Sequence, residues 1–364
     1  MQIPFLDLSR MDSDLQERLR MKFSQVLEKG IFSGGEEVQI LEKTIQQKLN
    51  SLYAIPCANG TDALELALRA LEIGEGDEVI VPALTWVSTA EAVRMVGAKP
   101  IFWDTDVNGL LRSDWVEAIT PKTNAVIPVH LYGRMVDMNA LAEVARIKGI
   151  SVIEDAAQAF GAFQDGKAAG IWGSVGCLSF YPTKNLGALG EAGMCLTQDE
   201  RLAEKIRLLS NHGQPKRDEH MLVGRNSRID TLQAAFLTVM LEDFEKQQQK
   251  RKSLAKIYLE ELSDIEGSEL PQGLMESNHN AHLFVVKSDK RNELREFLAE
   301  HGIGTAIHYP QIIPDMEPYY MEGDFSNART LANQGLSLPL NPWLKEEEVE
   351  KITEAIKSFF TKKS

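Results

Sequence analysis

The stretch SFYPTKNLG, residues 179–187, sets Lys184 directly after an apolar run that we expect to be a buried strand. Upstream, the stretch IEDAAQ, residues 153–158, ends another apolar run with Asp155. A lysine that can form a Schiff base, a carboxylate that pairs with a pyridinium nitrogen and small residues that admit a phosphate are what pyridoxal 5'-phosphate requires. The two stretches therefore indicate an enzyme that uses this cofactor.

Short apolar runs alternate with helical patterns between residues 55 and 200, which is typical of β-α-β units that build a mostly parallel sheet. In such a sheet, functional side chains gather beyond the carboxyl ends of the strands, and His130, Asp155 and Lys184 all fall at or just beyond such ends. We expect strands at 78–82, 100–103, 124–130, 150–154 and 177–180, and helices at 63–71, 89–96, 138–148 and 200–210.

The pattern of apolar and polar residues changes in the second half of the chain. Residues 211–228 are polar and too irregular for a packed element, and loops of this length are often functional or cross an interface. A helical stripe at 229–241 then continues into a charged run that we interpret as a solvated helix face. The remainder predicts a smaller α+β domain with a strand at 282–286 and helices at 254–262, 292–301 and 346–360. We expect a large cofactor-binding domain with its N-terminal segment at 1–250 and a small domain at 251–364.

Composition excludes several classes of function. A formal charge of -14 argues against nucleic acid as the main partner, because phosphate backbones are bound by clustered Lys and Arg. The three cysteines lack C-x-x-C spacing, so we expect reduced thiols and no metal site. The sequence has no basic and apolar leader and no uncharged apolar run near 18 residues. We therefore expect a cytoplasmic protein without a membrane segment.

Other candidate residues carry two interpretations each. Gly60 and Thr61 begin an expected helix, where unpaired N–H groups form an anion site or an ordinary cap. Trp86 follows a strand and offers either a flat face for a heteroaromatic ring or a core side chain. Asp155 either meets a pyridinium or caps the next helix. Glu191 lies among the glycines after Lys184, where it is either structural or orients that lysine.

Several motifs together resemble the DegT/StrS family of nucleotide-sugar aminotransferases, which serve deoxysugar and polysaccharide biosynthesis. These are pyridoxal phosphate enzymes of the aspartate aminotransferase fold, fold type I. That fold is α/β, with a large mostly parallel mixed sheet flanked by helices and a smaller C-terminal α+β domain. The motifs are NGTDAL (59–64), TWVST (85–89), EDAAQ (154–158), SFYPTKNLGA (179–188), NSR (226–228) and HYP (308–310).

The resemblance implies a role for each matching residue. Lys184 would bind the cofactor covalently, Asp155 would pair with its ring nitrogen, and Gln158 would face its phenolic oxygen. Trp86 would stack on the ring. Asn226 would reach the phosphate from the neighbouring subunit, so a homodimer with shared active sites is implied. The residues expected to hold the phosphate are Gly60, Thr61 and Ser179, and those expected near the substrate are Arg228, His308 and Tyr309. Apart from the resemblance, Arg225, Arg228 and His308 are each either a local source of positive charge for a diphosphate or structural.

The stretch KNLGALG, residues 184–190, looks most like the branch that aminates C3 of a dTDP-linked 3-keto-6-deoxyhexose, with L-glutamate as donor. Glu191, Thr183 and Gly35 depart from the family's usual Asp, Gly and Pro, which weakens the assignment of the sugar. A C4 aminotransferase, a transaminase of free keto acids and a noncatalytic regulatory protein remain as alternatives. A sugar dehydratase of the same fold has histidine at the lysine position, so Lys184 argues against it.

Overall fold

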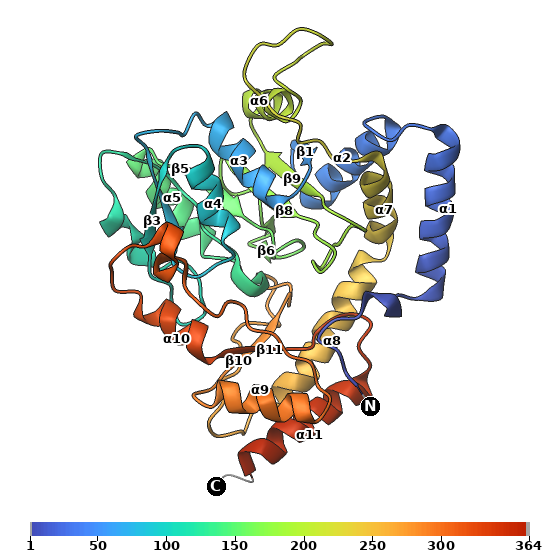
Figure 1. Ribbon diagram of the computed structural model, residues 1–364, viewed down its shortest axis with the longest axis vertical. Helices are drawn as coiled ribbons and strands as arrows, with labels where there is room; N and C mark the ends of the chain where they lie inside the picture. Colours follow the sequence, from blue (N-terminus) through green and yellow to red (C-terminus); the bar gives the residue numbers. More distant parts are fainter. Residues whose placement is uncertain (1, 362–364) are drawn as a thin grey trace.

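The structure, a computed structural model, describes residues 2–361. A seven-stranded mixed sheet lies between helices, and a smaller α+β part follows at the carboxyl-terminal end (Figure 1). The predicted fold class is therefore confirmed. The strand order is β1-β9-β8-β5-β4-β2-β3, and β9 runs antiparallel to both of its neighbours while the other pairs are parallel. The strands are β1 (Tyr53–Cys57), β2 (Glu78–Pro82), β3 (Lys99–Trp103), β4 (Thr123–Val126), β5 (Ser151–Asp155), β8 (Val175–Ser179) and β9 (Gly193–Thr197).

Helices cover the sheet: some, such as α1, bury one apolar stripe, whereas α3 and α7 are buried over most of their surface. In α1 the buried residues Leu15, Leu19 and Val26 recur at helical spacing, and both α1 and α2 pack against α7 (Figure 1). Asn59 caps α3 by accepting a hydrogen bond from the Asp62 N–H at 2.8 Å. The helices of this part are α1 (Ser13–Lys29), α2 (Glu36–Leu49), α3 (Gly60–Ala70), α4 (Ser88–Met95), α5 (Met138–Lys148), α6 (Glu200–Ser210) and α7 (Thr231–Glu242).

The smaller part is built on the long helix α8 (Phe244–Leu262), which reaches from the large hydrophobic cluster to a second one (Figure 1). Phe244 packs in the first cluster, whereas Leu254, Tyr258 and Leu262 pack in the second. The boundary expected at residue 250 falls inside this helix. The other elements here are β10 (Phe284–Lys287), β11 (Gly335–Leu338), α9 (Arg291–Glu300), α10 (Ser326–Gln334) and α11 (Glu346–Thr361).

Short elements complete the chain: the β6–β7 hairpin (Phe163–Gln164, Lys167–Ala168) and five 3-10 helices (Leu8–Arg10, Ser113–Ala118, Leu131–Gly133, Ile313–Asp315, Glu317–Tyr319). Within the part of the chain that the structure describes, no helix is both long and apolar enough to cross a bilayer.

Several predicted bounds agree with the structure, and others differ for identifiable reasons. β2, α5 and α6 have the expected bounds. β4 ends at Val126 and not at residue 130, because Pro128 has no N–H to donate, although the His130 N–H still donates to the Asp155 carbonyl. The helix expected at 254–262 is the second half of α8, because the charged run before it is helical as well. That run is not entirely a solvated face, since Arg251 is 6% exposed and its guanidinium donates to the His282 and Leu340 carbonyls. Residues 211–228 form the loop that extends past α6 (Figure 1).

We predict that Gly176→Ala destabilises the fold, because a Cβ at Gly176 would lie 2.0 Å from the Gly170 carbonyl oxygen. Gly170 cannot retreat freely, since its N–H donates to Glu154 at 2.8 Å. The expected loss is about 3 kcal/mol of the free energy of unfolding, measured from urea denaturation by circular dichroism. Gly74→Ala is the control, because its nearest contact would be 3.4 Å away. Equal stability of the two variants would contradict the steric argument.

Candidate active site

A lysine and a carboxylate meet at the carboxyl edge of the sheet. β5 and β8 are parallel neighbours in which Asp155 lies opposite Cys177, and Lys184 lies in the turn that follows β8. Asp155 is 6% exposed, and burial raises the pKa of its carboxyl group. Burial lowers the pKa of Lys184 to about 8, while the negative charge of Asp155 acts in the opposite direction. The pair therefore supplies a buried anion beside an amine that is partly neutral near pH 8.

Asp155 is also held by hydrogen bonds. Thr89 Oγ1, from the first turn of α4, donates to Asp155 Oδ2 at 2.8 Å, and the Ala157 N–H donates to Oδ1 at 3.2 Å. Sequence reasoning did not identify Thr89, although it lies in the TWVST motif. A hydroxyl that bonds a residue 66 positions away leaves no periodic signal in the sequence.

A cradle for an anion forms where α3 begins. A Cβ at Gly60 would lie 2.7 Å from Ser179 Cβ, so glycine alone lets the start of α3 approach the end of β8. Thr61 Oγ1 and Ser88 Oγ are 2.7 Å apart, and Ser88 is the first residue of α4. The N-termini of α3 and α4 thus lie close together, and both favour a negatively charged ligand. Ser88 is a second residue that sequence reasoning missed.

Aromatic and amide groups border the pair on the side of the smaller part. Trp86 is 57% exposed, and its ring centroid lies 5.5 Å from that of Tyr309. Gln158 donates from Nε2 to the Tyr309 hydroxyl at 3.0 Å and accepts from the Tyr132 N–H at 2.7 Å. The flat face of Trp86 is therefore available for stacking, and the orientation of the Gln158 amide is fixed on both sides.

Tyr132 and His308 connect the two hydrophobic clusters. The Tyr132 hydroxyl donates to the His308 carbonyl, which closes a ring of hydrogen bonds through Tyr309 and Gln158. His308 Nδ1 lies 2.8 Å from Ser337 Oγ. Burial, with the charge of Lys184, lowers the pKa of His308 to about 4, so the imidazole is neutral near pH 7. Tyr132 has a positive φ of 59° and was not predicted, because no sequence pattern marks such a tyrosine.

Asn226, Arg228 and Glu191 lie apart from this ring. All three line a polar pocket of about 330 Å³ that is also bordered by Asn59, the capping residue of α3. Arg228 is exposed, and its Nε donates to Asn226 Oδ1 at 3.1 Å. This pocket therefore adjoins the anion cradle at the start of α3, on the side of the projecting loop, residues 211–228.

Arg225 is already paired and is not a free cation. Its guanidinium bonds Glu65 and lies 3.2 Å from Asp62 Oδ1. Ser227 donates to the other oxygen of Asp62 at 2.6 Å. These contacts tie the end of the projecting loop to α3, so Arg225 positions the neighbouring Asn226.

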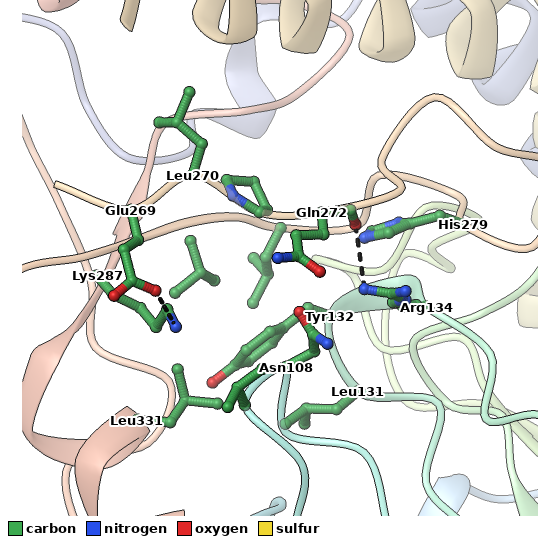
Figure 2. A pocket seen from close by; sticks show the side chains of 14 residues that line it. Asn108, Leu131, Tyr132, Arg134, Glu269, Leu270, Gln272, His279, Lys287 and Leu331 are labelled. Atoms are coloured by element: carbon green, nitrogen blue, oxygen red, sulfur yellow. Dashed lines mark hydrogen bonds and ion pairs between the residues drawn. The ribbon is translucent and has the colours of Figure 1, made fainter. Parts of the chain in front are cut away.

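Figure 2 shows a different pocket, of about 50 Å³, which Tyr132 helps to line. The Tyr132 ring forms one wall, and Arg134 and the Glu269–Lys287 ion pair lie at its rim. Its lining includes none of the residues expected to contact the cofactor. Tyr132 thus contributes to this pocket as well as to the ring of hydrogen bonds with His308 and Gln158.

The chain is similar to known proteins over nearly its whole length. The model of the DegT/DnrJ/EryC1/StrS aminotransferase family matches residues 13–357. A pleiotropic regulatory protein of Geobacillus stearothermophilus is 40% identical, with 99% of each chain covered. The dTDP-3-amino-3,4,6-trideoxy-alpha-D-glucose transaminase of Streptomyces venezuelae is 38% identical over 98% of this chain and 96% of its own. The UDP-2-acetamido-2-deoxy-3-oxo-D-glucuronate aminotransferase of Pseudomonas aeruginosa is 39% identical over 97% of this chain and 99% of its own.

Solved structures are similar to this chain as well. The crystal structure of S. venezuelae DesV superimposes with a TM-score of 0.95 at 38% identity and covers 98% of each chain. That of NtdA from Bacillus subtilis, with bound cofactor PMP, has a TM-score of 0.94 at 31% identity and covers 99% of this chain and 85% of its own.

We predict that Lys184 of the cofactor-free protein reacts with pyridoxal phosphate at a rate that rises with pH through a midpoint near 8, because only the neutral amine attacks an aldehyde. Asp155→Asn removes the charge that raises this pKa, so the midpoint should move to lower pH. The rate is measured from the visible absorbance, with Lys184→Ala as the control for other lysines. A midpoint near the usual lysine value of about 10.4 would contradict the burial argument.

Proposed function

Because the chain belongs to the DegT/DnrJ/EryC1/StrS aminotransferase family, we propose that it moves an amino group from L-glutamate to C3 of a nucleotide-linked keto sugar. A dTDP-3-keto-6-deoxyhexose is the first candidate. The observation that carries the proposal is the buried carboxylate of Asp155 with the partly buried amine of Lys184 near it, beside the close approach of Gly60 to Ser179.

The residues present fit pyridoxal 5'-phosphate, the cofactor of this family. A buried carboxylate such as Asp155 is costly unless a cation meets it, and a protonated ring nitrogen is such a cation. The start of α3, which Gly60 lets approach Ser179, suits the phosphate together with the Thr61 hydroxyl. Trp86 has an open face for the ring, and Gln158 Nε2 has a second N–H for the phenolic oxygen.

The chain's own groups perform the proton transfers. When bound, the cofactor supplies the electron sink that stabilises the carbanion. Lys184 would hold the cofactor, and its amine, once displaced by that of the donor, would take the α-proton and later return it. Its lowered pKa of about 8 leaves a useful fraction of that amine neutral near neutral pH. Asp155 remains in place throughout as the counter-charge of the ring nitrogen.

Support for the substrate is strongest for the position of the keto group. The names of the S. venezuelae and P. aeruginosa relatives both describe a sugar that is aminated or oxidised at C3, while one carries dTDP and the other UDP. We propose that Arg228, which is exposed beside Asn226, faces the diphosphate, because Arg225 is paired and His308 is neutral. We propose that His308 and Tyr309 border the sugar.

We further propose a homodimer in which Asn226 of the partner subunit reaches the cofactor phosphate. The tip of the 211–228 loop extends away from its own sheet (Figure 1), and Met221 and Val223 in that loop are 74% and 89% exposed. Apolar side chains so exposed are suited to a second copy of the chain. We place the reaction in the cytoplasm, since all three cysteines are free.

Addition of L-glutamate to the purified holoenzyme should abolish the absorbance of the Lys184-bound cofactor, and a dTDP-linked 3-keto-6-deoxyhexose should then restore it. Both half-reactions are followed in one cuvette by visible spectroscopy. Lys184→Ala is the control, because it lacks the amine that both half-reactions need. Restoration by a UDP-linked 3-keto sugar, a 4-keto sugar or a free keto acid alone would correct the substrate. Absence of any cofactor absorbance would overturn the proposal.

Mixing two inactive variants tests the shared site. Lys184→Ala and Asn226→Ala chains, unfolded and refolded together, should recover about a quarter of wild-type activity, because half of the dimers are mixed and each holds one intact site. Refolding each variant alone gives the baseline. If Asn226 serves its own chain, the mixture stays as inactive as the separate variants.

A further inference from the structure

Asp155 is the end point of a buried chain of hydroxyl groups. Thr89 Oγ1 donates to Asp155 Oδ2 at 2.8 Å, and Thr85 Oγ1 lies 3.3 Å from Thr89 Oγ1. Thr85 and Thr89 are 2% and 0% exposed, so water does not satisfy their hydroxyls. Both threonines lie in a short stretch before and at the start of α4, packed against the carboxyl end of β5.

The direction of this chain follows from the number of protons. A threonine hydroxyl has one proton, and Thr89 gives its proton to the carboxylate. Thr85 is therefore the donor in its bond with Thr89. Both dipoles point toward Asp155, and each polarises the next in the dry interior. The chain thus stabilises the ionised form of Asp155 and not the protonated form.

The other ionisable groups around Asp155 do not give lasting support to its charge. Lys184 has a free ammonium group only until it bonds the cofactor. His130 accepts the Val136 N–H at Nδ1, so its Nε2 carries the single ring proton and donates to Glu154 at 3.0 Å. Burial raises the pKa values of Tyr309 and Cys177, the remaining neighbours, which keeps both neutral.

Two permanent donors to the carboxylate therefore remain, the Ala157 N–H and the Thr89 hydroxyl. Burial raises the pKa of Asp155, and among the opposing influences the hydrogen bond from Thr89 is the largest. A hydrogen bond to a charged group is worth more than one between neutral groups. Only the Thr89 donor can be removed without altering the backbone.

We propose that Thr89, backed by Thr85, is a positioning residue that keeps Asp155 ionised, so that the proton shared with the cofactor stays on the ring nitrogen. The inference rests on the pyridoxal phosphate dependence given above. Without the Thr89 hydroxyl, the carboxylate becomes more basic, and the shared proton moves from the ring nitrogen toward Asp155. The ring is then a weaker electron sink, so the α-proton leaves more slowly.

The test compares Thr89→Val, which keeps the shape and removes the hydroxyl, with Thr89→Ser, which keeps the hydroxyl. Each holoenzyme is loaded with cofactor labelled with nitrogen-15 in the ring, and the nitrogen chemical shift is recorded. Thr89→Val should move this shift toward that of an unprotonated pyridine, and Thr89→Ser should leave it at the wild-type value. Thr85→Val should move it in the same direction by a smaller amount.

The matched control is Thr353→Val, because Thr353 is a buried threonine in α11 whose hydroxyl bonds only the Glu350 carbonyl. It should leave the shift unchanged. A stopped-flow measurement with L-glutamate should give a first half-reaction about tenfold or more slower in Thr89→Val, the effect expected for one lost bond to a charge.

An unchanged nitrogen shift in Thr89→Val would overturn the inference. If that variant does not bind the cofactor, an unchanged shift in Thr85→Val would do the same. Failure of the wild-type protein to bind the cofactor would instead count against the proposed function, so the two failures are distinguishable.

Discussion

A buried carboxylate and a partly buried amine at the same edge of a sheet form the constraint on which the rest of the structure depends. Asp155 is the last residue of β5, and Lys184 follows β8. Because β5 and β8 are parallel neighbours, the order of the strands brings the two groups near each other. Each charge is costly alone in this environment. The opposing effects of burial and mutual attraction leave an anion and a readily deprotonated amine, which is the combination that transamination needs.

Part of this arrangement could be predicted from the sequence. Apolar runs at the period of strands located β2, β5 and β8, and the positions after the last two pointed to Asp155 and Lys184, whereas Ser179 was expected only from the family resemblance. The helices α1 and α2 were not predicted, although Leu15, Leu19, Leu41 and Ile45 have the spacing of a buried stripe. Both helices could have been predicted, since the apolar spacing of a buried stripe is present in the sequence.

Other residues leave no pattern that could be interpreted. Thr89 and Tyr132 act through single hydroxyls and one N–H group, whose partners lie far away in the sequence. Glu154 looks like an ordinary strand residue, yet it is fully buried and accepts hydrogen bonds from His130 and from three backbone N–H groups of the loop before β8. Such contacts depend on how strands are ordered, which the local sequence does not encode.

The continuous helix α8 has a mechanical consequence. Its sequence between Phe244 and Leu262 contains neither glycine nor proline, so it offers no point of easy bending where it leaves one hydrophobic cluster for the other. A rod of this kind transmits torque and resists a wide hinge opening.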